Sequence, residues 1–160
     1  MAGARPPRVA LEATVTHRLH TLQKLTDRLT QLAYAAEAGI AIGEGRCLAA
    51  IGAFSPLSVN DLASKANLNK GQASRAAQAL VDAGLVRKDA STTDGRGVVL
   101  TLTAKGERVW QRLLAVIERR NEEIVSCLSE KERRQLGRLL DRLVEHARSA
   151  AARVQEADES

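Results

Sequence analysis

Residues 58–86 read SVNDLASKANLNKGQASRAAQALVDAGLV and carry the clearest structural signals of the sequence. Ser58 and Asn69 each stand three residues before an acidic or amide side chain. Such pairs start helices, because the first side chain accepts a backbone N–H of the first turn and the second reaches back to the cap. Gly84 stands where a left-handed residue is expected to end a helix. The stretch therefore predicts two short helices joined by only a few residues.

Two short β-type runs follow the second helix and flank a polar, turn-rich segment. The runs are residues 85–88 and 98–102, and the segment between them, residues 91–97, reads STTDGRG. This pattern is typical of a β-hairpin with a long polar tip. A helix-turn-helix followed by a hairpin is the winged-helix arrangement. It suits duplex DNA, because a major groove about 12 Å wide admits one α-helix and a thin hairpin can reach the neighbouring minor groove.

Longer helices are predicted on both sides of this centre. Apolar residues recur every three or four positions over residues 11–32, 109–128 and 136–154, which is the spacing of amphipathic helices. Glycines in residues 39–45 end the first pattern, and a shorter apolar helix is predicted over about residues 46–54. The long helices carry more apolar surface than a small central domain can cover. We therefore expect a second copy of the chain to cover it.

Composition limits the classes of protein that are possible. The chain has 160 residues, a formal net charge of +5, a pI of about 9.7 and only 2% aromatic residues. Residues 60–110 hold 8 Lys and Arg against 5 Asp and Glu, whereas residues 111–160 hold 10 of each. A modest basic surplus is weak support for a polyanionic partner. No apolar run is long enough for a membrane span and no signal peptide is evident, so we expect a cytoplasmic protein without membrane association.

The sequence gives little support for an enzyme. It has no nucleotide-binding glycine motif, no nucleophile elbow and no metalloprotease motif, and we predict no cofactor. His17 and His20 share a helix face but lack a third ligand nearby, so no metal site is predicted. Cys47 is predicted to be buried and Cys127 to be more exposed. The alternatives left open are a helical protein-interaction module that does not bind DNA, and a thiol- or metal-sensing regulator of the same fold.

Several stretches in fixed order resemble the MarR (multiple antibiotic resistance regulator) family of bacterial transcription factors. They are Ser58–Ala63, Gln72–Arg75 with Leu80, Gly84–Val86, Asp94–Arg96, Leu100–Thr103 with Gly106, and Leu128–Glu132. The resemblance implies a mainly α fold with a small β-hairpin wing, in which a winged helix-turn-helix is joined to a helical dimerisation bundle. It divides the chain into a flexible basic arm (1–10), the first bundle helix (11–38), the DNA-binding domain (46–102), the dimerisation helices (103–154) and an acidic tail (155–160).

The second helix of the helix-turn-helix would then read the DNA. Its first turns offer Lys70, Gln72, Ser74 and Arg75. Gln pairs with adenine and Arg with guanine through two hydrogen bonds each, whereas Ser and Lys serve mainly phosphates. In the wing, Arg96 would enter the minor groove, with Asp94 holding its guanidinium. Many family members carry a second basic residue a few positions later in the wing, where this chain has Val99.

Members of this family often bind phenolic or other aromatic acids between the bundle and the DNA-binding lobe. The resemblance therefore implies a small-molecule effector, and the residues able to meet an anionic aromatic ring are His20, Tyr34, Arg46 and Trp110. Taken together, these observations predict a homodimeric, sequence-specific regulator of transcription that binds double-stranded DNA. We expect a repressor that such an effector releases from a pseudo-palindromic operator.

Overall fold

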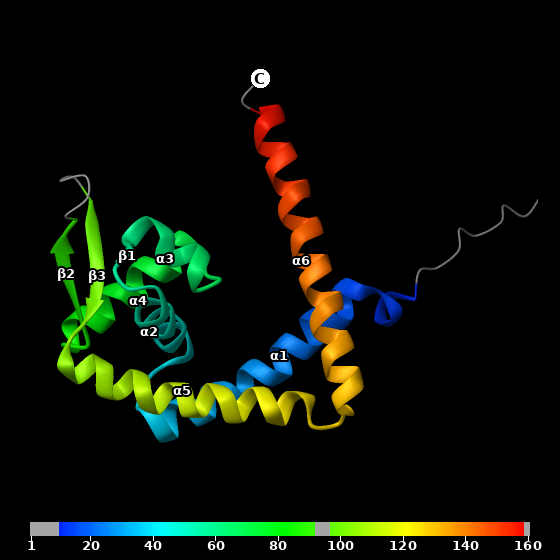
Figure 1. Ribbon diagram of the computed structural model, residues 1–160, viewed down its shortest axis with the longest axis horizontal. Helices are drawn as coiled ribbons and strands as arrows, with labels where there is room; N and C mark the ends of the chain where they lie inside the picture. Colours follow the sequence, from blue (N-terminus) through cyan, green and yellow to red (C-terminus); the bar gives the residue numbers. More distant parts are fainter. Residues whose placement is uncertain (1–9, 92–96, 159–160) are drawn as a thin grey trace, which may run out of the picture. The chain divides into compact units, whose positions relative to one another are not determined.

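Figure 1 shows the computed structural model, which describes residues 10–91 and 97–158. In chain order its elements are η1 (Leu11–Ala13), α1 (Val15–Ala33), η2 (Tyr34–Ala38), α2 (Ile42–Phe54), β1 (Leu57–Ser58), α3 (Val59–Lys65), α4 (Lys70–Asp82), β2 (Val86–Ala90), β3 (Val98–Leu102), α5 (Ala104–Val125) and α6 (Glu130–Asp158). The chain divides into two compact units, with the boundary between Arg120 and Asn121. The predicted mainly α fold with a small β wing is confirmed. Within the described ranges, no helix is long and apolar enough to cross a membrane.

The predicted signals of the helix-turn-helix are confirmed. The Ser58 hydroxyl accepts the backbone N–H of Asp61 at 3.1 Å and caps α3. Asn69 and Gln72 form a reciprocal capping box at the start of α4, and Gly84 follows α4 with a φ of +70°. Asn67, in the turn between the helices, also has a positive φ, of 52°. Local capping side chains therefore fix where α3 and α4 begin, and a left-handed glycine fixes where α4 ends.

The region before the helix-turn-helix differs from the prediction. The helix expected to begin near Arg46 begins at Ile42, so glycines expected to interrupt the chain lie inside α2. Gly45 fits there because α2 crosses close to Tyr34: an ideal Cβ at Gly45 would lie 2.5 Å from the ring. The N–H of Ile42 is satisfied by the side-chain oxygen of Gln31 at 2.9 Å. Contacts with α1 and η2 therefore support a helix start that the local sequence does not indicate.

The wing is part of a three-stranded antiparallel sheet in the order β1-β3-β2. The predicted hairpin is present, with Val86 opposite Leu102 and Ala90 opposite Val98, although β2 extends two residues beyond the predicted run. The third strand, β1, has only two residues and was not predicted, because so short a segment shows no alternation of polarity. β1 holds the base of β3 beside the start of α3.

Aliphatic side chains build the core of the first unit. Its largest fully buried side chains come from α2, α3, α4, β3 and α5: Cys47, Leu48, Ile51, Leu62, Leu80, Leu100 and Leu113. The predicted cap at Thr103 is confirmed, since its hydroxyl accepts the N–H of Gly106 at 3.0 Å. Gly106 lies against the backbone of Leu85, so α5 starts in direct contact with the residue that precedes β2. The core thus fixes α4 and the sheet as one lobe.

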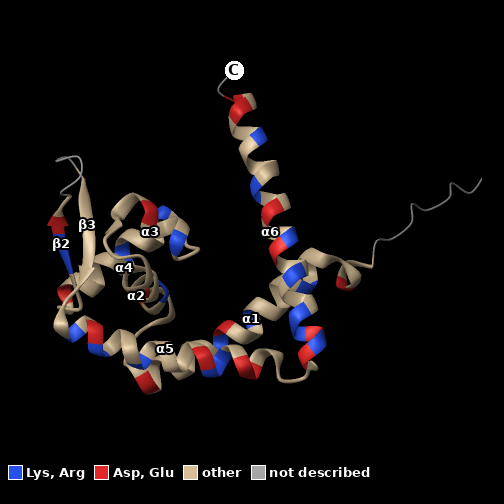
Figure 2. Cartoon of the chain, viewed as in Figure 1, with Lys and Arg blue, Asp and Glu red and all other residues tan. Residues whose placement is uncertain are grey.

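The second unit is dominated by α6, which begins at a predicted capping box. Glu132 accepts the N–H of Ser129 at 2.8 Å, and the Ser129 hydroxyl accepts the N–H of Glu132 at 3.4 Å. No residue of α6 is buried in the described chain. Charges of both signs alternate along the helix (Figure 2). Leu136, Leu139, Leu140 and Leu143 of α6 are exposed, and they recur at the three- and four-residue spacing of one helix face. The helix therefore presents an apolar face that its own unit does not cover.

The division of the chain into functional segments stays a prediction. Residues 1–9 of the predicted arm and residues 159–160 of the predicted tail lie outside the described residues.

Candidate nucleic-acid interface and adjoining cavity

The four residues predicted to read DNA all lie on the exposed side of α4. Lys70, Gln72, Ser74 and Arg75 are exposed over its first two turns. The opposite side of the helix packs into the core through small or apolar residues, namely Ala73, Ala76, Ala77 and Leu80. The core contact is made mainly by alanines, and the outer face of α4 is polar. An exposed helix with a polar outer face suits entry into a major groove.

Gln72 also has the capping role that the sequence predicts for it. The side-chain oxygen of Gln72 accepts the backbone N–H of Asn69 at 3.2 Å. The backbone N–H of Gln72 donates to the side-chain oxygen of Asn69 at 2.8 Å. The capping box therefore uses the amide oxygen of Gln72 and holds the side chain at the exposed start of α4. Arg75 reaches the same turn, since its Nη1 lies 3.4 Å from the position of an ideal Cβ on Gly71.

The wing residues Asp94 and Arg96 lie outside the described residues, but the base of the hairpin is described. Asp89 accepts hydrogen bonds from Arg87 and Thr101, both at 2.9 Å, and these bonds lower the pKa of its carboxyl group. Lys88 donates to the Gln78 side chain at 2.9 Å. This last contact joins β2 to α4, so the hairpin base and the proposed DNA-reading helix are held together.

The first unit also contains a cavity of about 550 Å³. Its apolar wall is formed by Ala49, Ala50, Ala53, Leu114 and Ile117, and Gln23, Ala66 and Asn67 also line it. Two of the predicted effector residues, Tyr34 and Arg46, meet at this cavity. The other two, His20 and Trp110, are not among the residues that line it. Instead, the Trp110 indole packs directly against Gly52 of α2.

Tyr34 and Arg46 differ in how available they are to a ligand. The Arg46 guanidinium is 2.7 Å from the carboxylate of Asp27, in a partly exposed ion pair. Tyr34 is buried, and this burial raises the pKa of its hydroxyl while the positive charge of Arg46 opposes the rise. The Tyr34 hydroxyl is therefore neutral at physiological pH.

Arg46 also lines a second hollow of about 470 Å³ between the start of α2 and α4, together with Gln72 and Arg75.

Phe54 and Lys65 also line the 550 Å³ cavity, and sequence reasoning did not single them out. The Lys65 ammonium lies 4.6 Å from the centre of the Phe54 ring. Phe54 ends α2 and Lys65 ends α3, so the pair joins the ends of two helices. In the sequence each is an ordinary helix-end residue, and no spacing rule connects positions on different helices.

The side chains that could act as sensors occupy different environments. Cys47 is buried, as predicted, and burial raises the pKa of its thiol to about 11, with the charge of Glu44 adding to the rise. It is therefore protonated at neutral pH and a poor nucleophile. Cys127 is exposed, as predicted. Among residues 10–91 and 97–158, no three His, Cys, Asp or Glu side chains gather as a metal site would require.

The fold and this surface together define a winged helix-turn-helix DNA-binding protein. Comparison with known proteins narrows the class. A profile of the MarR family matches residues 38–97. The HTH-type transcriptional regulator BilQ of Clostridium symbiosum is 30% identical over 105 residues, which are 66% of this chain and 73% of BilQ. The HTH-type transcriptional repressor Rv2887 of Mycobacterium tuberculosis is also 30% identical over 105 residues, covering 66% of this chain and 76% of Rv2887.

Solved structures give the same result. The structure of Rv2887 in complex with salicylic acid is similar with a TM-score of 0.69 at 26% identity, covering 84% of this chain and 99% of that one. The PcaV regulator of Streptomyces coelicolor, in complex with its natural ligand, has a TM-score of 0.72 at 24% identity, with 88% and 99% covered. The chain therefore belongs to the MarR family of winged-helix transcriptional regulators, a family of DNA-binding proteins rather than enzymes.

Proposed function

We propose that the protein is a homodimeric repressor that places two α4 helices in successive major grooves of a pseudo-palindromic operator. The observation that carries this proposal is the exposed polar start of α4, where Lys70, Gln72, Ser74 and Arg75 face away from the core. Two such helices, one from each protomer, would read half-sites about 34 Å apart. Lys70 and Ser74 would hold phosphates, and Gln72 and Arg75 would read bases. Arg96 and Asp94 keep their predicted role in the wing.

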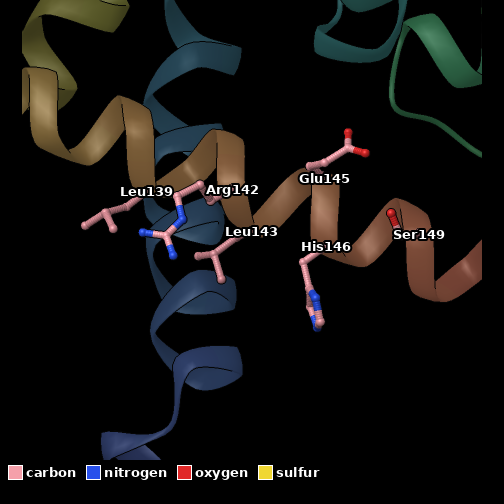
Figure 3. Close-up of a pocket in the computed structure, with 6 residues that line it drawn as sticks. All are labelled: Leu139, Arg142, Leu143, Glu145, His146 and Ser149. Atoms are coloured by element: carbon pink, nitrogen blue, oxygen red, sulfur yellow. The ribbon is translucent and has the colours of Figure 1, made fainter.

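The exposed apolar faces of α1 and α6 support the homodimer. α1 exposes Leu19, Leu22, Leu25, Leu29 and Leu32, and α6 exposes Leu136, Leu139, Leu140 and Leu143. Figure 3 shows Leu143 and His146 pointing to one side of α6 and Glu145 to the other. An open hollow of about 710 Å³ runs along this helix, lined by α6 residues alone. A helix with no buried residue gains its stability from packing, and a second copy of the chain would supply that packing.

The 550 Å³ cavity supports an aromatic acid as the effector. Its volume lies in the range of small-molecule sites, and it combines an apolar wall with Tyr34 and Arg46. Rv2887 has been crystallised with salicylic acid and with p-aminosalicylic acid. A ligand of this class would shift the population of the dimer towards a spacing of the two α4 helices that no longer fits both grooves. His20 and Trp110 remain predicted contacts outside this cavity.

The capping role of Gln72 allows a sharp test of DNA reading. In Gln72→Glu, the new carboxylate can still accept the N–H of Asn69, so the capping box is kept. The amide donor is lost, however, and a negative charge is placed against the DNA. We expect affinity for the preferred duplex to fall about 10- to 100-fold, the range for losing one two-bond base contact. Binding is measured by fluorescence anisotropy at fixed salt, and the free energy of unfolding should stay unchanged.

The matched control is Gln155→Glu, which makes the same charge change at an exposed position of α6. It should bind as the wild type does, because one added charge outside the reading surface is screened at moderate salt. Equal affinities for Gln72→Glu and the wild type would refute the role of Gln72 in reading DNA.

A further inference from the structure

The cavity between α1, α2, α3 and α5 is lined by cationic side chains. Its lining includes two cationic side chains, Arg46 and Lys65, and no Asp or Glu. Arg46 forms an ion pair with Asp27 at 2.7 Å, so much of its charge is already balanced by a carboxylate of this chain. A ligand carboxylate would have to share that guanidinium with Asp27 or displace it. Arg46 is therefore a poor candidate for the main anion contact.

Lys65 is in a different position. The contact that the structure gives its ammonium is the face of the Phe54 ring, 4.6 Å away. A contact of this kind at an exposed site is weak and leaves the positive charge unneutralised. A carboxylate is a much stronger partner for an ammonium group, because the hydrogen bond between them is assisted by both charges. Lys65 can therefore exchange a weak partner for a strong one when an acid enters the cavity.

The position of Lys65 in the chain links the cavity to the DNA-reading helix. Lys65 is the last residue of α3, and the next two residues, Ala66 and Asn67, also line the cavity. Asn67 has a left-handed backbone, and Asn69 then caps α4. Only four residues separate Lys65 from Lys70, where the proposed DNA contacts begin. A ligand that binds the Lys65 ammonium and moves it would therefore also move the turn that sets the position of α4.

We propose that Lys65 recognises the carboxylate of the effector and transmits its binding to the helix-turn-helix, and this rests on the proposed function of the cavity as an aromatic-acid site. The ring of the ligand lies against the apolar wall formed by Ala49, Ala53 and Ile117, and its carboxylate takes the Lys65 ammonium from Phe54. Lys65 is then a specificity-determining residue, which selects acids over neutral aromatic compounds.

The experiment compares salicylic acid with salicylamide, its neutral analogue, by calorimetry on the full-length protein. The wild type should bind salicylate at least about tenfold more tightly than salicylamide, the difference expected for a charge-assisted contact. Lys65→Met keeps the length of the side chain and an attractive contact with Phe54 but removes the charge. It should lose this preference by weakening salicylate alone, and should need at least about tenfold more salicylate to release DNA. Lys65→Arg should restore both.

The control is Lys24→Met, which removes the same charge from an exposed position of α1 that does not line the cavity. It should keep the preference of the wild type. If Lys65→Met keeps that preference while Arg46→Gln loses it, the cavity binds the acid but Lys65 does not recognise it, and the inference fails while the proposed function stands. If the wild type binds neither compound, both the inference and the proposed effector site fail.

Discussion

The double variant Leu139→Asp, Leu143→Asp is expected to be a monomer and to bind a full palindromic operator at least about 100-fold more weakly than the wild type. Both leucines are exposed on α6, at 44% and 52% of their surface, and lie one helical turn apart. Two carboxylates at these positions would be desolvated in a dimer interface, which is strongly unfavourable. A monomer reads one half-site only and loses the gain that comes from linking two binding events. Light scattering gives the mass, and anisotropy gives the affinity.

The matched control for this variant is Arg148→Asp, which changes the net charge by the same amount. Arg148 is exposed, and helical periodicity places it on the side of α6 away from Leu139 and Leu143. This variant should remain a dimer. A dimeric Leu139→Asp, Leu143→Asp protein with normal affinity would show that α6 does not hold the protomers together.

Gly106→Ala is expected to lower the free energy of unfolding by about 3 kcal/mol, at the upper end of overpacking costs. An ideal Cβ at Gly106 would overlap the backbone carbonyl of Leu85, and a backbone group cannot rotate away as a flexible side chain can. The start of α5 would have to move away from Leu85, the residue that precedes β2. Because this contact helps to hold the lobe together, DNA affinity should fall as well. Urea unfolding followed by circular dichroism measures the loss.

Gly43→Ala serves as the control, since a Cβ at this helical position of α2 meets nothing within 4 Å. Alanine is the better helix former, so the variant should be more stable by up to about 1 kcal/mol. If the Gly106→Ala protein were as stable as the wild type, close packing of α5 on Leu85 would not contribute to the fold.

The parts of the fold that were predictable depend on local chemistry. Ser58, Asn69, Thr103 and Ser129 each cap a helix within three residues, and Gly84 ends α4 through its own backbone freedom. Each of these signals involves only residues that lie within one helical turn of each other in the sequence. The position of the helix-turn-helix could therefore be predicted from sequence alone, and with it the exposed face of α4.

The parts that were not predictable depend on contacts between distant residues. The early start of α2 relies on Gln31 and on the fit of Gly45 against Tyr34. The cavity unites residues of several elements, so the sequence could name Tyr34 and Arg46 by their chemistry but could not select Lys65.

Selection of duplexes from a random DNA library by the wild-type protein tests whether two copies of this chain read two half-sites through α4. We expect the enriched sequences to share a pseudo-palindrome whose half-site centres are about 10 base pairs apart. We also expect two chains on each duplex and an affinity that falls steeply with salt. Enrichment of a single asymmetric site bound by one chain, or no enrichment at all, would refute the proposed mode of DNA binding.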